Sequence, residues 1–146
     1  MKKVIVYTDG ACLSNPGPMG IGFILCYNGH EIKVGRYIGE GTNNRAEIWA
    51  VIEALKSIKK KDVHVILHTD SQLVYGYLTQ GWKVKKNKEL VEEMKRLCEE
   101  FARLEVVKVK GHADNAANNE VDRLARKAAR KRILRKFHEE KYKIKN

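Results

Sequence analysis

The fold is decided by residues 3–17, KVIVYTDGACLSNPG. The run of β-forming residues from Val4 to Thr8 predicts a strand that closes at Asp9. The turn-forming residues Asn15 to Pro18 predict a loop shortly afterwards. The chain is therefore expected to begin with a strand that carries a carboxylate at its end, close to a loop.

Strands and helices alternate along the rest of the chain. Asn28-Gly29 readily takes the positive φ angles of a type I′ turn and predicts a hairpin. Asn43 or Asn44 is expected to cap the first helix, and Asn87 a later one. Helices that cross between strands make some strand pairs parallel, so the order predicts an α/β fold with one mixed sheet. The predicted strands are Val4–Thr8, Gly22–Tyr27, Glu31–Ile38, Val63–His68 and Val106–Val109, and the predicted helices are Ala46–Ile58, Ser71–Thr79, Leu90–Leu104 and Val121–Phe137.

The composition fits one globular domain. The chain has 146 residues, of which 43% are hydrophobic and 32% are charged. No apolar run approaches the ~20 residues that a membrane span needs, which excludes an integral membrane protein. Asp9 interrupts the N-terminal apolar run before a signal peptide can form, and Cys12, Cys26 and Cys98 lack disulfide or zinc spacing. We therefore expect a reduced, cytoplasmic protein.

Positive charge is concentrated near the C-terminus. The net charge is +11, and residues 123–146 hold 11 positive and 2 negative side chains. Such a segment favours a polyanionic partner, although charge runs are often only solvated helix faces. We expect residues 1–129 to form the domain and residues 130–146 to form a basic extension, helical or partly flexible, that is not a second domain.

Four acidic residues lie at the ends of predicted elements. Asp9 and Asp70 follow the first and fourth strands, and Glu47 and Asp122 lie in the first turns of two helices. If the two strands are neighbours, Asp9 and Asp70 meet at one edge of the sheet. Glu47 shares a helical stripe with apolar residues and leans toward the sheet. The four acids can then converge, and a cation must offset their repulsion.

Grouped carboxylates suit Mg²⁺, with Mn²⁺ as an alternative. Two such ions can activate a water and hold the leaving oxygen of a phosphodiester. Each acid also has a simpler explanation, because aspartate forms turns at strand ends and the helix dipole favours acids near N-termini. The pattern of acids alone leaves both explanations open.

Four short motifs occur in order between Val4 and Ala129. They are Tyr7–Cys12 with Asn15–Gly17, Thr42–Glu47, Thr69–Gln72, and Val109–His112 followed by Asp122. Together they resemble the motifs of the type 1 ribonuclease H family. The resemblance implies a ribonuclease H-like fold, with a five-stranded mixed sheet of three antiparallel strands and then two parallel ones, flanked by helices. Residues 1–129 would be the ribonuclease H domain.

The resemblance also implies an activity. The enzyme would be an endonuclease that hydrolyses the RNA strand of RNA–DNA hybrids and leaves 5′-phosphate and 3′-hydroxyl ends. Asp9, Glu47, Asp70 and Asp122 would be catalytic ligands of two Mg²⁺ ions, or of Mn²⁺, and His112 would assist proton transfer or product release. The expected partner is the hybrid duplex, with no membrane and no obligate protein partner.

Substrate-contacting residues follow from the same resemblance. Asn15, Asn43 and Gln72 stand where the family reads the minor groove, and amides both donate to and accept from a ribose 2′-hydroxyl. Simpler explanations are a turn for Asn15, a helix cap for Asn43 and a surface position for Gln72. The other candidate contacts, to the backbone and phosphates of the hybrid, are Cys12, Ser14, Thr42 and Trp82.

The chain departs from the family pattern in two places. Asn119 stands where family members often have a glutamate. This difference affects the residues that would hold Asp122 in position, and not Asp122 itself as a metal ligand. Leu78–Lys88 is too short for the extra basic helix with which some members grip the hybrid. Trp82 lies there among lysines and either contacts the sugar-phosphate backbone or packs on the helix beneath it. The basic C-terminal segment either supplies the missing grip or docks on the body and adds stability.

Two other functions compete with a hybrid-specific nuclease. The first is a catalytically silent nucleic-acid-binding module. Four uncompensated carboxylates would weaken the binding of nucleic acid by such a module, and metal-dependent turnover would exclude it. The second is an integrase-like enzyme that acts on DNA. Asn15, Asn43 and Gln72 favour the enzyme that reads RNA, and a comparison of a hybrid with an all-DNA duplex separates the two.

Overall fold

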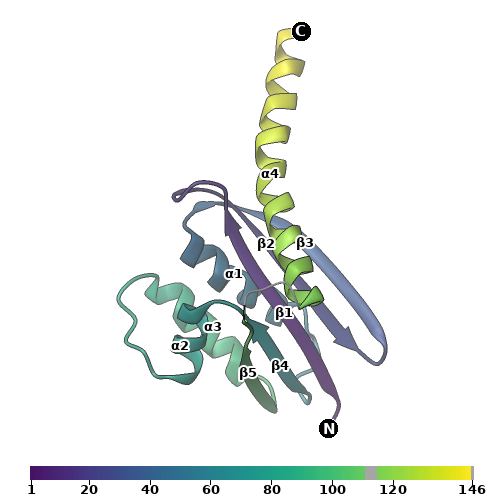
Figure 1. The fold of residues 1–146 in the computed structure, drawn as a ribbon, viewed down its shortest axis with the longest axis vertical. Helices are drawn as coiled ribbons and strands as arrows, with labels where there is room; N and C mark the ends of the chain where they lie inside the picture. The colour runs from purple at the N-terminus through teal and green to yellow at the C-terminus, as the bar shows by residue number, and fades with distance from the viewer. Residues whose placement is uncertain (111–114, 146) are drawn as a thin grey trace.

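A five-stranded mixed sheet forms the centre of the molecule (Figure 1). The computed structural model describes residues 1–110 and 115–145, and side chains as far as Lys131. The sheet order is β3-β2-β1-β4-β5, with antiparallel pairs from β1 to β3 and parallel pairs from β1 through β4 to β5. The predicted α/β fold is therefore confirmed. The strands are β1 (Lys3–Cys12), β2 (Gly17–Tyr27), β3 (His30–Gly41), β4 (His64–Thr69) and β5 (Arg103–Lys108), and the helices are α1 (Asn43–Lys56), α2 (Gln72–Thr79), α3 (Lys88–Glu99) and α4 (Ala116–Lys145).

The hairpin between β2 and β3 confirms the turn prediction. Asn28 and Gly29 have φ angles of 49° and 75°, the left-handed values that a type I′ turn needs. The turn aligns Tyr27 with His30 and extends the antiparallel pairing along both strands. This half of the sheet provides most of the surface on which α4 lies.

The two faces of the sheet carry different helices. On one face, α1 to α3 enclose the hydrophobic core, with fully buried side chains such as Phe23, Ile52 and Leu67. On the other face, α4 crosses β2, β1 and β3. A Cβ at Gly22 would overlap the backbone of α4 at Val121, so the glycine allows the helix to lie directly on the strand. Small residues on both elements therefore fix where α4 crosses the sheet.

The strands are longer than the sequence predicted. β1 continues past Thr8 to Cys12 because its residues keep pairing with β2, with Cys12 opposite Met19. Asp9 therefore lies inside β1 and does not end it, so its predicted position at the strand end was wrong. β5 begins at Arg103, where Leu104 pairs with Val65, although helical periodicity had assigned Leu104 to the preceding helix.

The helix boundaries also required correction. α1 starts at Asn43, and its cap is Thr42, whose hydroxyl accepts a hydrogen bond from the Arg45 N–H at 3.3 Å. Neither Asn43 nor Asn44 is the cap, and Glu47 lies in the second turn rather than the first. Asn87 does precede α3, but without a capping hydrogen bond from its side chain.

Helix α4 is the longest element, with 30 residues from Ala116 to Lys145, well beyond the predicted end at Phe137. Figure 1 shows its C-terminal half projecting past the edge of the sheet. Among the described residues, no helix combines the length and apolar character required to cross a membrane.

Candidate active site

The candidate site forms where β4 ends and β1 continues. The last parallel pair joins Thr8 to Thr69, so the next residues, Asp9 and Asp70, emerge side by side on neighbouring strands. Asp9 still pairs with Gly22 of β2 on its other side and is only 4% exposed. The predicted meeting of Asp9 and Asp70 at one place on the sheet therefore agrees with the structure.

Glu47 reaches the same place from α1. A Cβ at Gly10 would overlap the backbone of Ala46 and Glu47, so the glycine lets α1 approach β1 closely. The Gly10 N–H donates to Asp9 Oδ1 at 2.9 Å and to Glu47 Oε1 at 3.1 Å. One backbone amide therefore orients two of the acids, a function that the sequence analysis did not assign to Gly10.

Asp9, Glu47 and Asp70 form an acidic cluster. One carboxylate oxygen of each lies within 4.8 Å of the other two, a spacing at which they can hold a metal ion. Burial raises the pKa of Asp9 to about 7, and the nearby charges of Asp70 and Asp122 add to this rise. Burial raises the pKa of Glu47 as well, with further contributions from Asp9 and Asp70. The cluster is therefore poorly stabilised as a set of anions by the protein alone.

One oxygen of the cluster is left unsatisfied within the described part of the chain. Glu47 Oε2 is buried and has no hydrogen-bond partner within the described part of the chain. A buried carboxylate oxygen without a partner is costly, and a hard cation satisfies it and offsets the like charges. The residues present therefore fit a divalent metal ion.

Asp122 approaches the cluster from α4 in a different environment. Its carboxylate raises the pKa of Asp9 through its charge and through a hydrogen bond between the two side chains. It is not one of the three acids within 4.8 Å of one another, and its side chain is 43% exposed. The Arg126 Nε donates to Asp122 Oδ1 at 3.0 Å, a pairing that the four-residue spacing of the two side chains on a helix favours but that was not predicted above. His112, the other predicted catalytic residue, lies outside the described residues.

Two predicted substrate-reading residues meet at the start of α1, the helix that carries Glu47. Asn15 Oδ1 accepts a hydrogen bond from the Asn43 N–H at 3.1 Å, which ties the β1–β2 loop to the start of α1. Cys12 Sγ donates to the carbonyl oxygens of Ser14 and Gly41, at 2.6 and 3.3 Å. Ser14 Oγ donates to the Pro16 carbonyl oxygen at 3.0 Å. Cys12 and Ser14 thus shape this loop from within.

Gln72 and Trp82 lie at the start of α2 and just after its end. Gln72 is the first residue of α2, directly after the cap Ser71, so it follows Asp70 closely. Trp82 is 41% exposed, and its ring packs against Gly76 of α2, as the simpler alternative for this residue expected. Arg45 Nη1 donates to Asn87 Oδ1 at 2.9 Å and links α1 to the loop that contains Trp82. No local sequence pattern predicts this link, because Arg45 and Asn87 are far apart in the chain.

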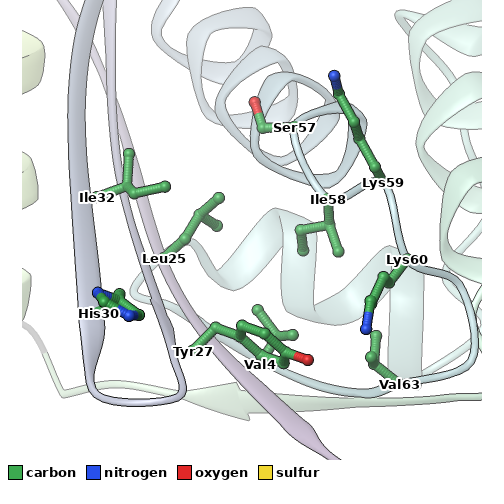
Figure 2. Close-up of a pocket in the computed structure, with 10 residues that line it drawn as sticks. All are labelled: Val4, Leu25, Tyr27, His30, Ile32, Ser57, Ile58, Lys59, Lys60 and Val63. Atoms are coloured by element: carbon green, nitrogen blue, oxygen red, sulfur yellow. The ribbon is translucent and has the colours of Figure 1, made fainter.

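A separate hollow lies at the opposite end of α1 (Figure 2). Its volume is about 320 Å³, and its lining includes Val4, Leu25 and Ile58, with Lys59 and Lys60 beside them. It contains no carboxylate. The acidic cluster, and not this hollow, therefore has the chemistry of a catalytic site.

The match to known proteins agrees with this geometry. The RNase H family model matches residues 1–130. The chain belongs to the ribonuclease H family. Among curated relatives of this ribonuclease H, the Ribonuclease H of Acetivibrio thermocellus is 45% identical over 139 residues, covering 86% of this chain and 93% of the relative. The Ribonuclease H of Chlorobium luteolum is 40% identical over 144 residues, covering 90% and 98%.

Solved structures of other ribonucleases H share the fold. LC11-RNase H1, isolated from compost by a metagenomic approach, has a TM-score of 0.78 and 33% identity, covering 91% of this chain and 99% of that one. LC11-RNase H1 has also been solved in complex with an RNA/DNA hybrid, with a TM-score of 0.77 and 31% identity over 89% and 99% of the two chains. RNase H1 from the archaeon Halobacterium salinarum has a TM-score of 0.76 and 32% identity over 86% and 96%.

Proposed function

We propose that this ribonuclease H hydrolyses the RNA strand of RNA–DNA hybrids and leaves 5′-phosphate and 3′-hydroxyl ends. The observation that carries the proposal is the acidic cluster at the end of β4, in which three carboxylates lie within 4.8 Å of one another. The cluster occurs on a chain of this family, one relative of which has been solved with an RNA/DNA hybrid. A silent binding module would gain nothing from the cost of burying these acids.

Asp9, Glu47 and Asp70, joined by Asp122 from α4, would hold two Mg²⁺ ions, with Mn²⁺ as an alternative. Bound ions of this kind lower the pKa of water and stabilise negative charge on the leaving oxygen of a phosphodiester. The chain itself orients the ligands: the Gly10 N–H fixes the Asp9 and Glu47 carboxylates through two hydrogen bonds. Asp122 would complete this set from α4, where its side chain is 43% exposed and pairs with Arg126.

The loops beside the cluster would select the substrate. The Asn15 and Asn43 contact places two amide side chains next to the start of α1, and Gln72 starts α2 just after Asp70. Amide side chains can hydrogen-bond a ribose 2′-hydroxyl and so distinguish RNA from DNA, which lacks this group. Cys12, Ser14, Thr42 and Trp82 would contact the backbone of the hybrid, and Thr42 does so while its hydroxyl caps α1.

Two further parts of the proposal come from the sequence. His112 would transfer a proton or assist product release, because an imidazole can both donate and accept a proton. The protein would act in the cytoplasm, where thiols stay reduced, and Cys12, Cys26 and Cys98 are all free thiols.

Cleavage of labelled duplexes tests the proposal. An RNA–DNA hybrid, the RNA duplex and the DNA duplex of the same sequence are incubated with the full chain and Mg²⁺, with and without EDTA. The expected result is Mg²⁺-dependent cutting of the hybrid's RNA strand alone. Binding without cutting would instead indicate the silent module, and cutting of DNA would indicate the integrase-like enzyme.

A further inference from the structure

The hollow of Figure 2 lies at the opposite end of α1 from the acidic cluster. The helix has 14 residues and is therefore about 21 Å long, with Glu47 near its start and Ser57 as its C-terminal cap. The hollow has a volume of about 320 Å³, at the lower end of the roughly 300–1,000 Å³ that ligand pockets span. A group bound in the hollow therefore stays well separated from the acids.

The hollow is lined by residues that also belong to the hydrophobic core. Val4, Leu25 and Ile58 are only 4%, 7% and 7% exposed, so the surrounding core holds them in place. Leu25 and its strand partner Ile32 come from the β2–β3 hairpin, and Ile58 comes from the segment after α1, across the hollow (Figure 2). Ile32 is 56% exposed, although it is aliphatic and lies within a strand. The hollow is thus a preformed apolar surface that remains open to contact.

Three lysines border this apolar surface. Lys59 and Lys60 line the hollow, and Lys2 Nζ lies 5.8 Å from the centre of the Tyr27 ring, which lines it as well. All three lysines are exposed. In the part of the chain that the structure describes, none of them forms an ion pair with a carboxylate. The border of the hollow therefore carries uncompensated positive charge.

Other lysines on the same segments do have acidic partners. Lys61 pairs with Glu100 at 3.7 Å, and Lys33 pairs with Glu31 at 3.4 Å. Because side chains alternate along a strand, Glu31 points to the face of β3 opposite to Ile32 and does not reach the hollow. Unpaired positive charge thus coincides with open apolar surface at one place, and a ligand that is both acidic and apolar complements this combination.

We propose that the hollow binds a short acidic peptide segment of a partner protein. One large apolar side chain of the segment would enter between Ile32 and Ile58, and its carboxylates would pair with Lys59 and Lys60. A nucleic-acid backbone would pair with the lysines but would leave the apolar surface uncovered. The contact would attach the enzyme to its partner while the acidic cluster stays free for substrate, so the inference goes beyond the proposed function and does not depend on it.

Labelled peptides of eight residues test whether both features of the ligand are needed. The parent peptide has one Phe with two Asp on each side, and Gly and Ser form its ends. One comparison peptide has Ala in place of Phe, another has Asn in place of every Asp, and two further parent peptides carry Leu or Trp instead of Phe. Binding to the full chain is measured by fluorescence anisotropy in EDTA.

The parent peptide should bind at least about tenfold more tightly than either comparison peptide. Burial of a large apolar side chain strengthens binding by roughly 10- to 100-fold, which the Ala peptide loses. The Asn peptide loses the pairing with the lysines. Because salt screens exposed charges, the affinity of the parent peptide should also fall several-fold between 50 and 500 mM salt.

Variants of the full chain locate the binding site. Lys59→Gln combined with Lys60→Gln, and separately Ile32→Thr, should each weaken binding of the parent peptide by about five- to tenfold. Lys127→Gln combined with Lys131→Gln removes the same charge from exposed positions on α4, across the sheet, and should bind like the unmodified chain. The rate of hybrid cleavage should be unchanged in all of these variants and in the presence of the peptide.

Three results would overturn the proposal. The first is the absence of binding by the Phe, Leu and Trp peptides, or binding that does not require both the apolar residue and the aspartates. The second is displacement of the bound peptide by an RNA–DNA hybrid in EDTA, which would assign the lysines to nucleic acid. The third is light scattering that shows a dimer of the full chain and a monomer of Ile32→Thr, which would assign the hollow to a second copy. Peptide binding is measured without cleavage, so failure of the proposed function leaves this test intact.

Discussion

Asp9 and Asp122 reach the same site from contrasting environments. Asp9 lies within the central strand, is 4% exposed, and has a pKa raised to about 7 by burial and by its acidic neighbours. The Asp122 side chain is 43% exposed on a helix and pairs with Arg126. The sheet therefore encloses Asp9 among like charges, whereas α4 presents an acid that solvent and an arginine already stabilise. Removing charge should have unequal consequences at the two places.

Asparagine substitutions at Asp70 and Asp122 test whether the two acids differ in importance for catalysis, and they give the largest expected effect on the rate of cleavage. Asp70→Asn keeps the size of the side chain but removes a charge from the acidic cluster, and it should lower the rate of hybrid cleavage by more than about 10³-fold. Asp122→Asn should cost only about 10-fold, because an exposed amide oxygen can still serve as a ligand. Rates are measured under single-turnover conditions in Mg²⁺, with circular dichroism to confirm that both variants are folded. Equal losses in the two variants would remove the distinction between the sheet acids and the helix acid.

The second prediction concerns the stability of the metal-free protein. The pKa of Asp9 is about 7 in the folded state against an ordinary value of 3.8. The folded state therefore binds this proton more tightly than the unfolded state, and the stabilisation is complete below about pH 3.8 and lost as the pH rises toward 7. At about 1.4 kcal/mol for each pH unit, the Asp9 contribution falls by about 4 kcal/mol across this range.

Urea unfolding in EDTA measures this contribution. The free energy of unfolding of the wild type minus that of Asp9→Asn should decrease from pH 4 to pH 7, and saturating Mg²⁺ should remove most of the decrease. The subtraction cancels the titration of acids that do not interact with Asp9, while Glu47, whose pKa Asp9 raises, contributes to the measured difference. Parallel stability curves for the two proteins would show that Asp9 ionises as easily in the fold as in the unfolded chain.

Sequence reasoning succeeded where one local pattern decides the structure. The Asn28-Gly29 turn, the parallel neighbours of Asp9 and Asp70, and the inward lean of Glu47 all follow from period and turn chemistry. It failed where pairing between distant segments decides. β1 extends through Asp9 because β2 pairs with it, and Leu104 leaves its helical pattern because β4 offers it a partner.

The chemistry of the site was likewise only partly predictable from the sequence. The acids were recognised from their positions, but the bifurcated Gly10 N–H and the unpartnered Glu47 Oε2 depend on how closely α1 approaches β1. That approach is fixed by packing between segments far apart in the chain. The Arg126 pair was readable from its spacing to Asp122, but its relevance depends on where α4 crosses the sheet.

The third prediction separates proton transfer from charge stabilisation. His112→Ala should slow cleavage by about 10²-fold, less than Asp70→Asn, because the imidazole would move a proton without holding the acids together. A side chain that moves a proton contributes to the pH dependence of the rate, so the pH profile of the variant should differ in shape from that of the wild type. The pH profile of kcat measures it, with His30→Ala as a control at an exposed histidine far from the acids in the chain. A profile that His112→Ala leaves unchanged would contradict the proposed role.

The smallest expected effect lies in the ion pair on α4. Arg126 is 62% exposed and Asp122 43% exposed, so their pair stabilises the fold by less than about 1 kcal/mol. Arg126→Gln should therefore leave unfolding almost unchanged. It should nevertheless lower the Mg²⁺ concentration for half-maximal cleavage by about two- to threefold, because Asp122 loses a competing cation. Arg123→Gln, which breaks the neighbouring pair with Glu120, is the matched control and should leave the Mg²⁺ requirement unchanged. If both variants shift this requirement equally, the effect comes from the net charge of α4, and Asp122 is not the helix acid that the metal ion engages.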